Sequence, residues 1–463
     1  MPRREATGRI GDLDYTVRLE ELPLRRSGGT AQGTLSAFSY TVDAPGRPVL
    51  FLTNGGPGVS SMYLHLSGIG PWRARVPVAP GDHGLPPYGI QESPSTILDA
   101  ADLVFLDAPG TGFGTFADGA DRSAFRTVEG DADAVAAAIG DWRDRHGRWD
   151  APTFFLGESY GTLRAAFLAT NPHGMDTAPL SGIALLGQAV NIQETQDRPG
   201  NIVGALANLP FKAAVAWYHG VGSREHPSVE DAIAAALDFA RGDLAAAMLQ
   251  GDELPTAERA AVAARLSAMI GIPADELVRD RLWVGKSDFR ARLLPGEVLG
   301  VTDSRYRAPA ADRRLGELDA DPADVALSPR YVTGLARLLR EAFGDAPEEV
   351  YRFVDPDAGR DWDWQEQGGA AFPTYGRPSP FHTYPYPARL SRWMKQNAQA
   401  RLFIGTGVYD ALTTVGAADH LLRHFDLPRA RTRSHAYRGG HMMYSDPEVS
   451  AQLNADLRAF LTD

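Results

Sequence analysis

The sequence predicts an α/β fold with a mostly parallel central sheet and a mainly helical insertion. Over the first 190 residues, continuously apolar runs of strand length alternate with helical patterns, as in parallel sheets that helices cover on both faces. The same alternation returns near the C-terminus, whereas helical patterns dominate between the two parts. We therefore expect a first core segment at 1–190, a helical insertion or cap at 191–374 and a second core segment at 375–463.

The individual elements follow from periodicity and capping signals. Buried strands are expected at residues 49–52, 103–106, 154–156, 183–186 and 402–404, and a further strand at 434–437. Gly147 is placed to end a helix and Ser228 to begin one. The Ser328-Pro329 pair is predicted to open another helix, which ends at Gly344.

Composition excludes several classes of function. The net charge is −12 and no basic run could follow a phosphate backbone, so nucleic acid is not an expected partner. The chain contains no cysteine, which excludes disulfides and thiolate metal sites. No apolar run reaches membrane-spanning length and no secretory segment follows the basic N-terminus, so we expect no membrane association and a cytoplasmic location.

A candidate nucleophile lies between a predicted strand and a predicted helix. The motif Gly-Glu-Ser-Tyr-Gly at 157–161 has the spacing of a nucleophile elbow, in which a sharp turn exposes the serine and flanking glycines avoid clashes. Ser159 is the predicted nucleophile, and the amide of Tyr160 is a predicted oxyanion donor. A glycine-rich turn with an incidental serine would give the same five letters.

The glycine-rich segment at 53–58 directly follows another predicted strand. Its consecutive glycines would let backbone amides approach a reacting carbonyl, and Gly56 is the second predicted oxyanion donor. An ordinary tight turn is the alternative, since Gly-Gly-Pro-Gly favours turns in any case. A phosphate-binding loop is disfavoured because no Gly-Lys-Ser/Thr follows.

An acid and a base follow in the order that an α/β-hydrolase fold requires. Asp410 and His441 each come just after a predicted strand near the C-terminus, where they would complete a Ser–acid–His triad. In such a triad the histidine deprotonates the serine, and the acid orients the imidazole. His420 and His424 lie four residues apart but lack the glutamate of a zinc motif, so we expect a surface pair, no metal and no cofactor.

With these residues in place, the sequence resembles the serine carboxypeptidase family, especially its bacterial, cysteine-poor members. The resemblance extends over nearly the whole chain and depends on four motifs in order, at residues 54–61, 107–112, 157–161 and 440–442, and on the segment at 216–220. It implies the triad Ser159, Asp410 and His441 and the oxyanion donors Gly56 and Tyr160. It also implies that Asn54 and Glu158, with Gly55 in the same loop, bind the substrate, including its terminal carboxylate.

Two positions depart from the family pattern. Val59 replaces the usual cysteine, and Gly68 replaces the glutamate that normally pairs with Glu158. Arg73 or Arg164 would be a substitute clamp for a carboxylate, since arginine binds carboxylates bidentately.

Three functions remain open at this point. The first is a peptidase that releases C-terminal residues through an acyl-enzyme. The second is a serine esterase or acyltransferase with the same triad, which the missing glutamate favours. The third is a non-catalytic binding protein with the same fold. The expected partner is a peptide or a small acyl substrate, and the sequence specifies no oligomeric state.

Overall fold

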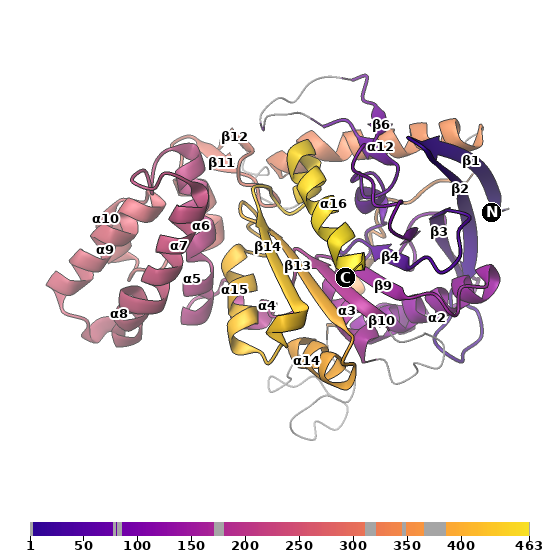
Figure 1. The fold of residues 1–463 in the computed structure, drawn as a ribbon. Helices are drawn as coiled ribbons and strands as arrows, with labels where there is room; N and C mark the ends of the chain where they lie inside the picture. Colours follow the sequence, from indigo (N-terminus) through magenta and orange to yellow (C-terminus); the bar gives the residue numbers. More distant parts are fainter. Residues whose placement is uncertain are drawn as a thin grey trace.

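The computed structural model describes residues 3–76, 80, 86–170, 180–310, 321–344, 349–364 and 386–462. A ten-stranded sheet runs through the molecule in the order β1-β2-β3-β7-β4-β9-β10-β13-β14, with β8 paired to β3 (Figure 1). The strands are β1 (Arg4–Ile10), β2 (Leu13–Pro23), β3 (Gly33–Thr41), β4 (Val49–Thr53), β7 (Asp102–Leu106), β8 (Thr115–Phe116), β9 (Thr153–Glu158), β10 (Leu180–Leu186), β13 (Arg401–Gly407) and β14 (Thr432–Tyr437).

The neighbouring strands β7, β4, β9, β10, β13 and β14 form the parallel part of the sheet, and they include every strand predicted from the sequence. The α/β prediction is therefore confirmed. The antiparallel strands β1 to β3 at one edge were not predicted. In β1, half-buried and exposed positions alternate along Arg-Glu-Ala-Thr-Gly-Arg-Ile, so this strand lacks the apolar run that marks a buried strand.

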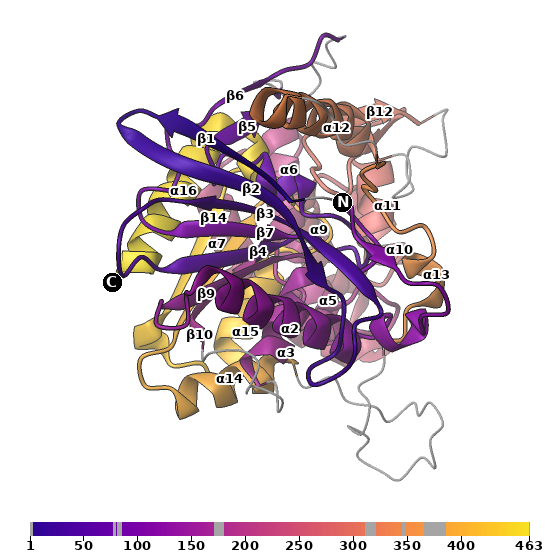
Figure 2. The ribbon, with the colours of Figure 1, turned by 90° about the vertical axis from the view of Figure 1, so that its right-hand side faces the viewer.

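Helices cover both faces of the sheet (Figure 2). Successive side chains of a strand point to opposite faces. Accordingly Leu50 and Leu52 of β4 join one apolar core, and Val49 and Phe51 join the other. The first core includes α1 (Met62–His65), α12 (Pro322–Phe343) and α16 (Pro447–Thr462), and the second includes α2 (Val128–His146), α3 (Gly161–Ala169), α14 (Tyr386–Gln396) and α15 (Val415–His424).

Most of the segment between β10 and β13 forms a helical body beside the sheet, at the left of Figure 1. This body has an apolar core of its own, which is separate from the two cores of the sheet. Its elements are α4 (Ile192–Thr195), α5 (Ile202–Ala207), α6 (Leu209–His219), α7 (Val229–Phe239), α8 (Ala245–Gln250), α9 (Thr256–Ile270), α10 (Ala274–Arg279), α11 (Lys286–Arg292), β11 (Glu297–Leu299) and β12 (Arg307–Pro309).

Helix α12 differs from the rest of the expected insertion, because it packs on the sheet. It begins at Pro322, so the prediction that Ser328-Pro329 opens this helix is wrong. Pro322 takes the first-turn position where a proline loses no hydrogen bond, whereas Pro329 lies inside the helix. The predicted ends at Gly344 and Gly147 and the Ser228 cap are confirmed. The expected boundary at 374/375 lies outside the described residues.

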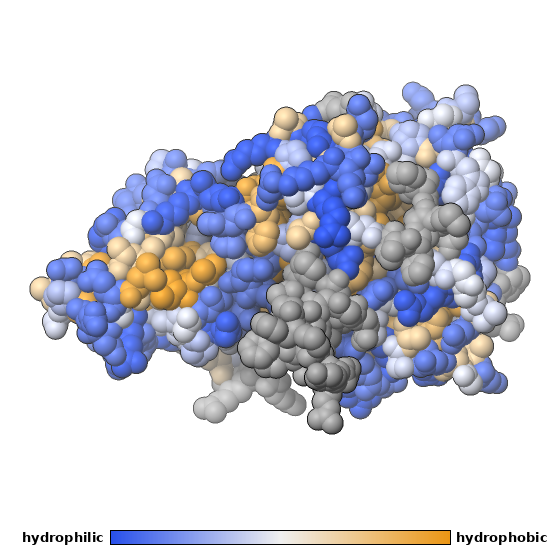
Figure 3. Space-filling model, turned by 90° about the horizontal axis from the view of Figure 1, so that it is seen from below, coloured by the Kyte–Doolittle hydropathy of each residue, from blue (hydrophilic) through white to orange (hydrophobic). Residues whose placement is uncertain are grey.

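The surface of the helical body carries a concentration of apolar side chains (Figure 3). Where this body meets the core, a groove of about 660 Å³ lies between α5, α7 and α15. None of the helices in the described ranges combines the length and the apolar character needed to cross a bilayer. The remaining elements are β5 (Trp72–Ala74), β6 (Ile90–Glu92) and α13 (Ala358–Asp361).

Candidate active site

Ser159 occupies the sharp turn between β9 and α3, as the motif predicted. Its φ of 57° lies in the left-handed region, which is strained for a residue other than glycine. The flanking glycines make this turn possible: a Cβ on Gly157 would stand 2.1 Å from the carbonyl oxygen of Gly161, and a Cβ on Gly161 would stand 2.9 Å from that of Thr53. The strand–turn–helix context of a nucleophile elbow is therefore present.

The loop after β4 lies directly against this turn. A Cβ on Gly55 would be 2.6 Å from the backbone nitrogen of Tyr160 and 2.8 Å from the Cβ of Ser159. Only a glycine permits this approach. The amides of Gly56 and Tyr160 donate no hydrogen bond to any described residue. The two predicted oxyanion donors thus lie on adjoining segments with unused N–H groups beside the candidate nucleophile.

Asp410 and His441 are brought together by the carboxyl ends of β13 and β14. His441 Nδ1 lies 2.7 Å from Asp410 Oδ2, and both side chains are buried. The other carboxylate oxygen, Oδ1, accepts the backbone amides of Leu412 at 2.7 Å and Thr413 at 3.1 Å. Burial opposes protonation of His441, but the charge and hydrogen bond of Asp410 outweigh it and raise the pKa of the imidazole.

Thr413 is a member of the site that sequence analysis did not identify. Its hydroxyl donates to Asp410 Oδ2 at 2.5 Å and lies 3.3 Å from His441 Nδ1. Asp410 therefore accepts hydrogen bonds at both oxygens, and its orientation toward the imidazole is fixed from several sides. Thr413 follows the acid by three residues, and that spacing alone gives no distinguishing signal.

The candidate nucleophile and the imidazole both lie near the carboxyl end of strand β10. The amide of Ser159 donates to the carbonyl of Leu186 at 2.9 Å. At the next residue, a Cβ on Gly187 would be 3.0 Å from both Cε1 and Nδ1 of His441. Ser159 and His441 are thus close to two consecutive residues of one strand end. No hydrogen bond joins the Ser159 hydroxyl to His441 among the described residues.

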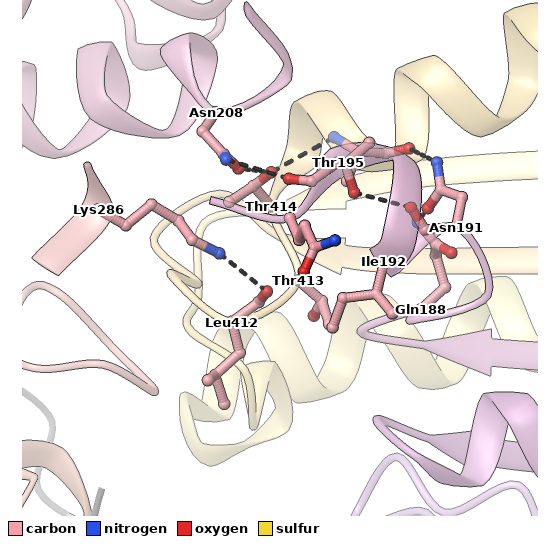
Figure 4. A pocket seen from close by; sticks show the side chains of 11 residues that line it. Gln188, Asn191, Ile192, Thr195, Asn208, Lys286, Leu412, Thr413 and Thr414 are labelled. Atoms are coloured by element: carbon pink, nitrogen blue, oxygen red, sulfur yellow. Dashed lines mark hydrogen bonds between the residues drawn. The ribbon is translucent and has the colours of Figure 1, made fainter. Parts of the chain in front are cut away.

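A small polar cavity is lined in part by Leu412, Thr413 and Thr414, which follow Asp410 in the chain (Figure 4). Its volume is about 20 Å³, which is enough for one water molecule. Lys286 of α11 reaches across from the helical body and donates to the carbonyl of Leu412 at 3.3 Å. Thr414 Oγ1 donates to Asn208 Oδ1 at 2.9 Å. The helical body therefore holds the segment that carries the acid.

Asn54 and Glu158, the predicted carboxylate-binding pair, are in direct contact. Asn54 Nδ2 donates to Glu158 Oε2 at 2.9 Å, and Tyr444 OH donates to the same oxygen at 2.7 Å. Oε1 accepts nothing from the described residues. Burial raises the pKa of Glu158 to about 7, although the charge of His441 and the two hydrogen bonds oppose the rise. Near neutral pH, a large share of Glu158 is therefore protonated.

The structure explains why position 68 carries no acidic partner for Glu158. Gly68 has a φ of +92°, and a Cβ there would lie 3.0 Å from Ser93 Oγ and 3.2 Å from Ser450 Oγ. A glutamate would be both strained and crowded at this backbone conformation. Tyr444, which sequence analysis missed, donates the additional hydrogen bond to Glu158.

Arg164 was one of two arginines expected to bind a substrate carboxylate, and that expectation is wrong. Its guanidinium is fully buried and paired with Asp131 through Nε at 2.8 Å and Nη2 at 3.1 Å. Nη1 donates to Thr53 Oγ1 at 2.8 Å and to the carbonyl of Asn54 at 3.0 Å. Arg164 thus fixes the base of the glycine loop from inside the protein.

Replacing Arg164 with alanine is expected to lower the free energy of unfolding by about 3–5 kcal/mol, because it leaves the buried Asp131 carboxylate unpaired. Chemical denaturation monitored by circular dichroism measures this loss. Arg423→Ala is the control, since Arg423 pairs with Asp419 on the exposed side of α15 and should cost less than about 1 kcal/mol. Equal stability losses in the two variants would contradict the structural role of Arg164.

Two further acids, Asp321 and Asp324, are linked to His441 through Thr302. Thr302 accepts the backbone amide of His441 at 2.6 Å, and its own hydroxyl donates to Asp321 and Asp324. Burial, followed by the charge of Asp321, raises the pKa of Asp324 to about 7.

Among the described residues, no group of three or more histidines and carboxylates is arranged to hold a metal ion. His420 and His424 stack on α15 with ring centroids 4.3 Å apart.

Comparisons with known proteins bear on the family and on the fold. The model of the serine carboxypeptidase family matches residues 37–196. Kex1(delta)p, a prohormone-processing carboxypeptidase from Saccharomyces cerevisiae, superimposes with a TM-score of 0.56 at 14% identity and covers 96% of this chain and 91% of its own. The family match confirms the resemblance to serine carboxypeptidases over residues 37–196 and supports a hydrolase. The structural match confirms the α/β-hydrolase fold.

Two further solved structures match with lower TM-scores. VinJ has a TM-score of 0.40 at 11% identity, over 96% of this chain and 99% of its own. A thermophilic esterase from Thermogutta terrifontis has a TM-score of 0.38 at 13% identity, over 96% and 100%. No curated protein sequence matches the chain.

Proposed function

We propose that the protein is a serine carboxypeptidase that releases C-terminal residues from peptides through an acyl-enzyme on Ser159. The observation that carries this proposal is the contact between Asn54 and Glu158, whose burial raises its pKa to about 7, next to Ser159 and the His441–Asp410 pair. A hydrolase that acts inside a chain or on simple esters has no need of an acid group at this position.

The reaction follows from the roles of the paired side chains. His441 accepts the proton of the Ser159 hydroxyl as the oxygen attacks the last peptide carbonyl, and Asp410 stabilises the resulting imidazolium. The amides of Gly56 and Tyr160 donate to the oxyanion. His441 then protonates the leaving amine, and a water molecule, deprotonated by the same histidine, hydrolyses the acyl-enzyme.

Recognition of the chain end is assigned to Glu158. Its Oε1 accepts no hydrogen bond in the described part of the chain, so the protonated carboxyl can donate from this oxygen to a substrate carboxylate. The ionised form would instead repel that carboxylate. Asn54 keeps the group in place, because its Oδ1 accepts the amide of Leu64 at 3.0 Å while its Nδ2 binds Glu158.

The direct test compares peptides with a free C-terminal carboxylate and the same peptides with a C-terminal amide. We expect release of the last residue from the free acid with a kcat/KM at least about tenfold higher than for the amide, since one charge-assisted hydrogen bond contributes about 1.5–3 kcal/mol. Mass spectrometry of the digests reports both rates. Equal rates for the two peptides would refute the exopeptidase assignment.

Glu158 also predicts a specific dependence on pH. Above the pKa of about 7 the free enzyme must take up a proton to bind a carboxylate, so KM for free-acid peptides should rise by up to about tenfold per pH unit. In Glu158→Gln this rise should vanish, because the amide stays neutral and remains a donor. Steady-state kinetics from pH 6 to about pH 8.5, with amidated peptides as the control, measure this slope. A slope that persists in the variant would assign the titration to another group.

A serine esterase or acyltransferase is the second candidate, and the observation that favours it is Gly68. Without a second acid the site binds a terminal carboxylate with fewer groups, and the same acyl-enzyme can form from an ester. This function predicts high turnover of simple acyl esters and no preference between free and amidated peptide ends.

A further inference from the structure

Arg73 of β5 lies beside the position where the second acid is missing. Its Cβ is 3.5 Å from the site of a Cβ on Gly68, and the neighbouring Ser67 forms an isolated antiparallel bridge with it. The amide of Ala74 donates to the carbonyl of Leu66 at 3.0 Å, which fixes β5 against the segment that follows α1. The backbone therefore places the start of the Arg73 side chain next to Gly68.

This arginine is buried and has no partner among the described residues. Only 6% of its surface is exposed, yet its Nε finds no hydrogen-bond acceptor in that part of the chain. None of the described carboxylates forms an ion pair with it. Burial lowers the pKa of its guanidinium, which shows how little solvent compensates the charge. A desolvated and unpaired cation is costly, and a bound anion would relieve that cost.

The acid whose charge acts on Arg73, Asp446, does not fill this role. Asp446 is close enough for its charge to act on Arg73, but its Oδ1 accepts the backbone amides of Glu448 at 3.0 Å and Val449 at 3.3 Å. Its Oδ2 lies 3.8 Å from Arg305. Asp446 is therefore engaged as a cap of α16 and as a partner of another arginine.

Two tyrosines connect Arg73 with Glu158. Burial raises the pKa of Tyr331, the charge of Arg73 opposes this rise, and the charge of Glu158 adds to it. Tyr331 OH is 3.0 Å from Ser445 Oγ, and the adjacent Tyr444 donates to Glu158 at 2.7 Å. The charges of Arg73 and Glu158 therefore act on the same buried phenol, whose partner Ser445 is the chain neighbour of Tyr444.

We propose that Arg73 binds the terminal carboxylate of the substrate together with Glu158, in place of the acid that position 68 cannot carry. This inference rests on the proposed function and adds the residue that determines its specificity. Arginine presents two parallel N–H groups to a carboxylate and keeps its charge at every relevant pH. Glu158 donates only when protonated, so Arg73 supplies the part of recognition that does not depend on pH.

The test is to replace Arg73 with methionine, which retains the length of the side chain and removes the charge. We expect KM for free-acid peptides to rise roughly 10- to 100-fold, with kcat changed less than about threefold and the kinetics of amidated peptides unaffected. Arg73→Lys retains the charge but lacks the two parallel N–H groups, so its KM for free-acid peptides should lie between those of the wild type and Arg73→Met. Arg75→Met removes the same charge from the exposed residue two positions along and should behave as the wild type.

The outcomes separate the two proposals. If the wild type prefers free acids and Arg73→Met or, should that variant not fold, Arg73→Lys retains the full preference, the role of Arg73 is refuted and the carboxypeptidase function stands. If the wild type shows no preference, the proposed function fails and the role of Arg73 fails with it. An equal rise of KM for free and amidated peptides in the variants would assign Arg73 a structural role and also overturn the inference.

Discussion

Ser159→Ala should lower kcat for release of a C-terminal residue roughly a millionfold, to the level of the background reaction, because no other group at the elbow can form the acyl-enzyme. The rate is measured by quantifying the released amino acid. Substrate binding should persist, since Asn54 and Glu158 are untouched, and isothermal titration with a slowly cleaved peptide checks this point.

Ser60→Ala is the matched control for this substitution. Ser60 is buried two residues after the glycine-rich segment at 53–58 and lies outside the proposed triad. The Ser60→Ala variant should keep a kcat within about tenfold of the wild type, as expected for a residue with no role in proton transfer. A Ser159→Ala enzyme that keeps more than about one thousandth of the wild-type rate would show that another nucleophile acts.

The second large effect is expected for Asp410→Asn, which should reduce kcat by about ten-thousandfold. Asp410 Oδ1 accepts two backbone amides, so an asparagine is held with its oxygen at that position and its NH₂ toward His441. The NH₂ would then donate to Nδ1 and impose the wrong imidazole tautomer. Thermal stability should change far less than activity.

Asp419→Asn provides the comparison for Asp410→Asn. Asp419 lies on α15 and forms ion pairs with Arg241 and Arg423 near the surface. Its loss should leave kcat unchanged and cost less than about 1 kcal/mol of stability. Loss of activity in proportion to loss of folded protein in Asp410→Asn would reduce the role of Asp410 to a structural one.

Sequence alone predicted those parts of the site that depend on local backbone geometry. The elbow at Ser159 and the glycine loop at Gly55 and Gly56 require glycine at fixed positions, because other residues would collide with neighbouring backbone atoms. Asp410 and His441 could be located because each follows a strand of the predicted parallel sheet, and the carboxyl ends of parallel strands meet at one edge.

The parts that sequence did not predict depend on contacts between distant segments. Tyr444 reaches Glu158 from a position 286 residues away, and nothing local distinguishes it from other tyrosines. Arg164 looked available for a substrate because its partner Asp131 lies on a different helix. Strand β1 was missed for a related reason: it pairs along an edge of the sheet, so it does not need an apolar run.

The most direct measurement of the central claim is covalent labelling with a fluorophosphonate, followed by peptide mapping. Such a probe reacts with an alcohol that a base has activated beside oxyanion donors. We predict a single label on Ser159 in the folded wild-type protein, and labelling slowed at least a thousandfold in His441→Ala. A label on a different residue, or equally fast labelling of Ser159 without His441, would contradict the assignment.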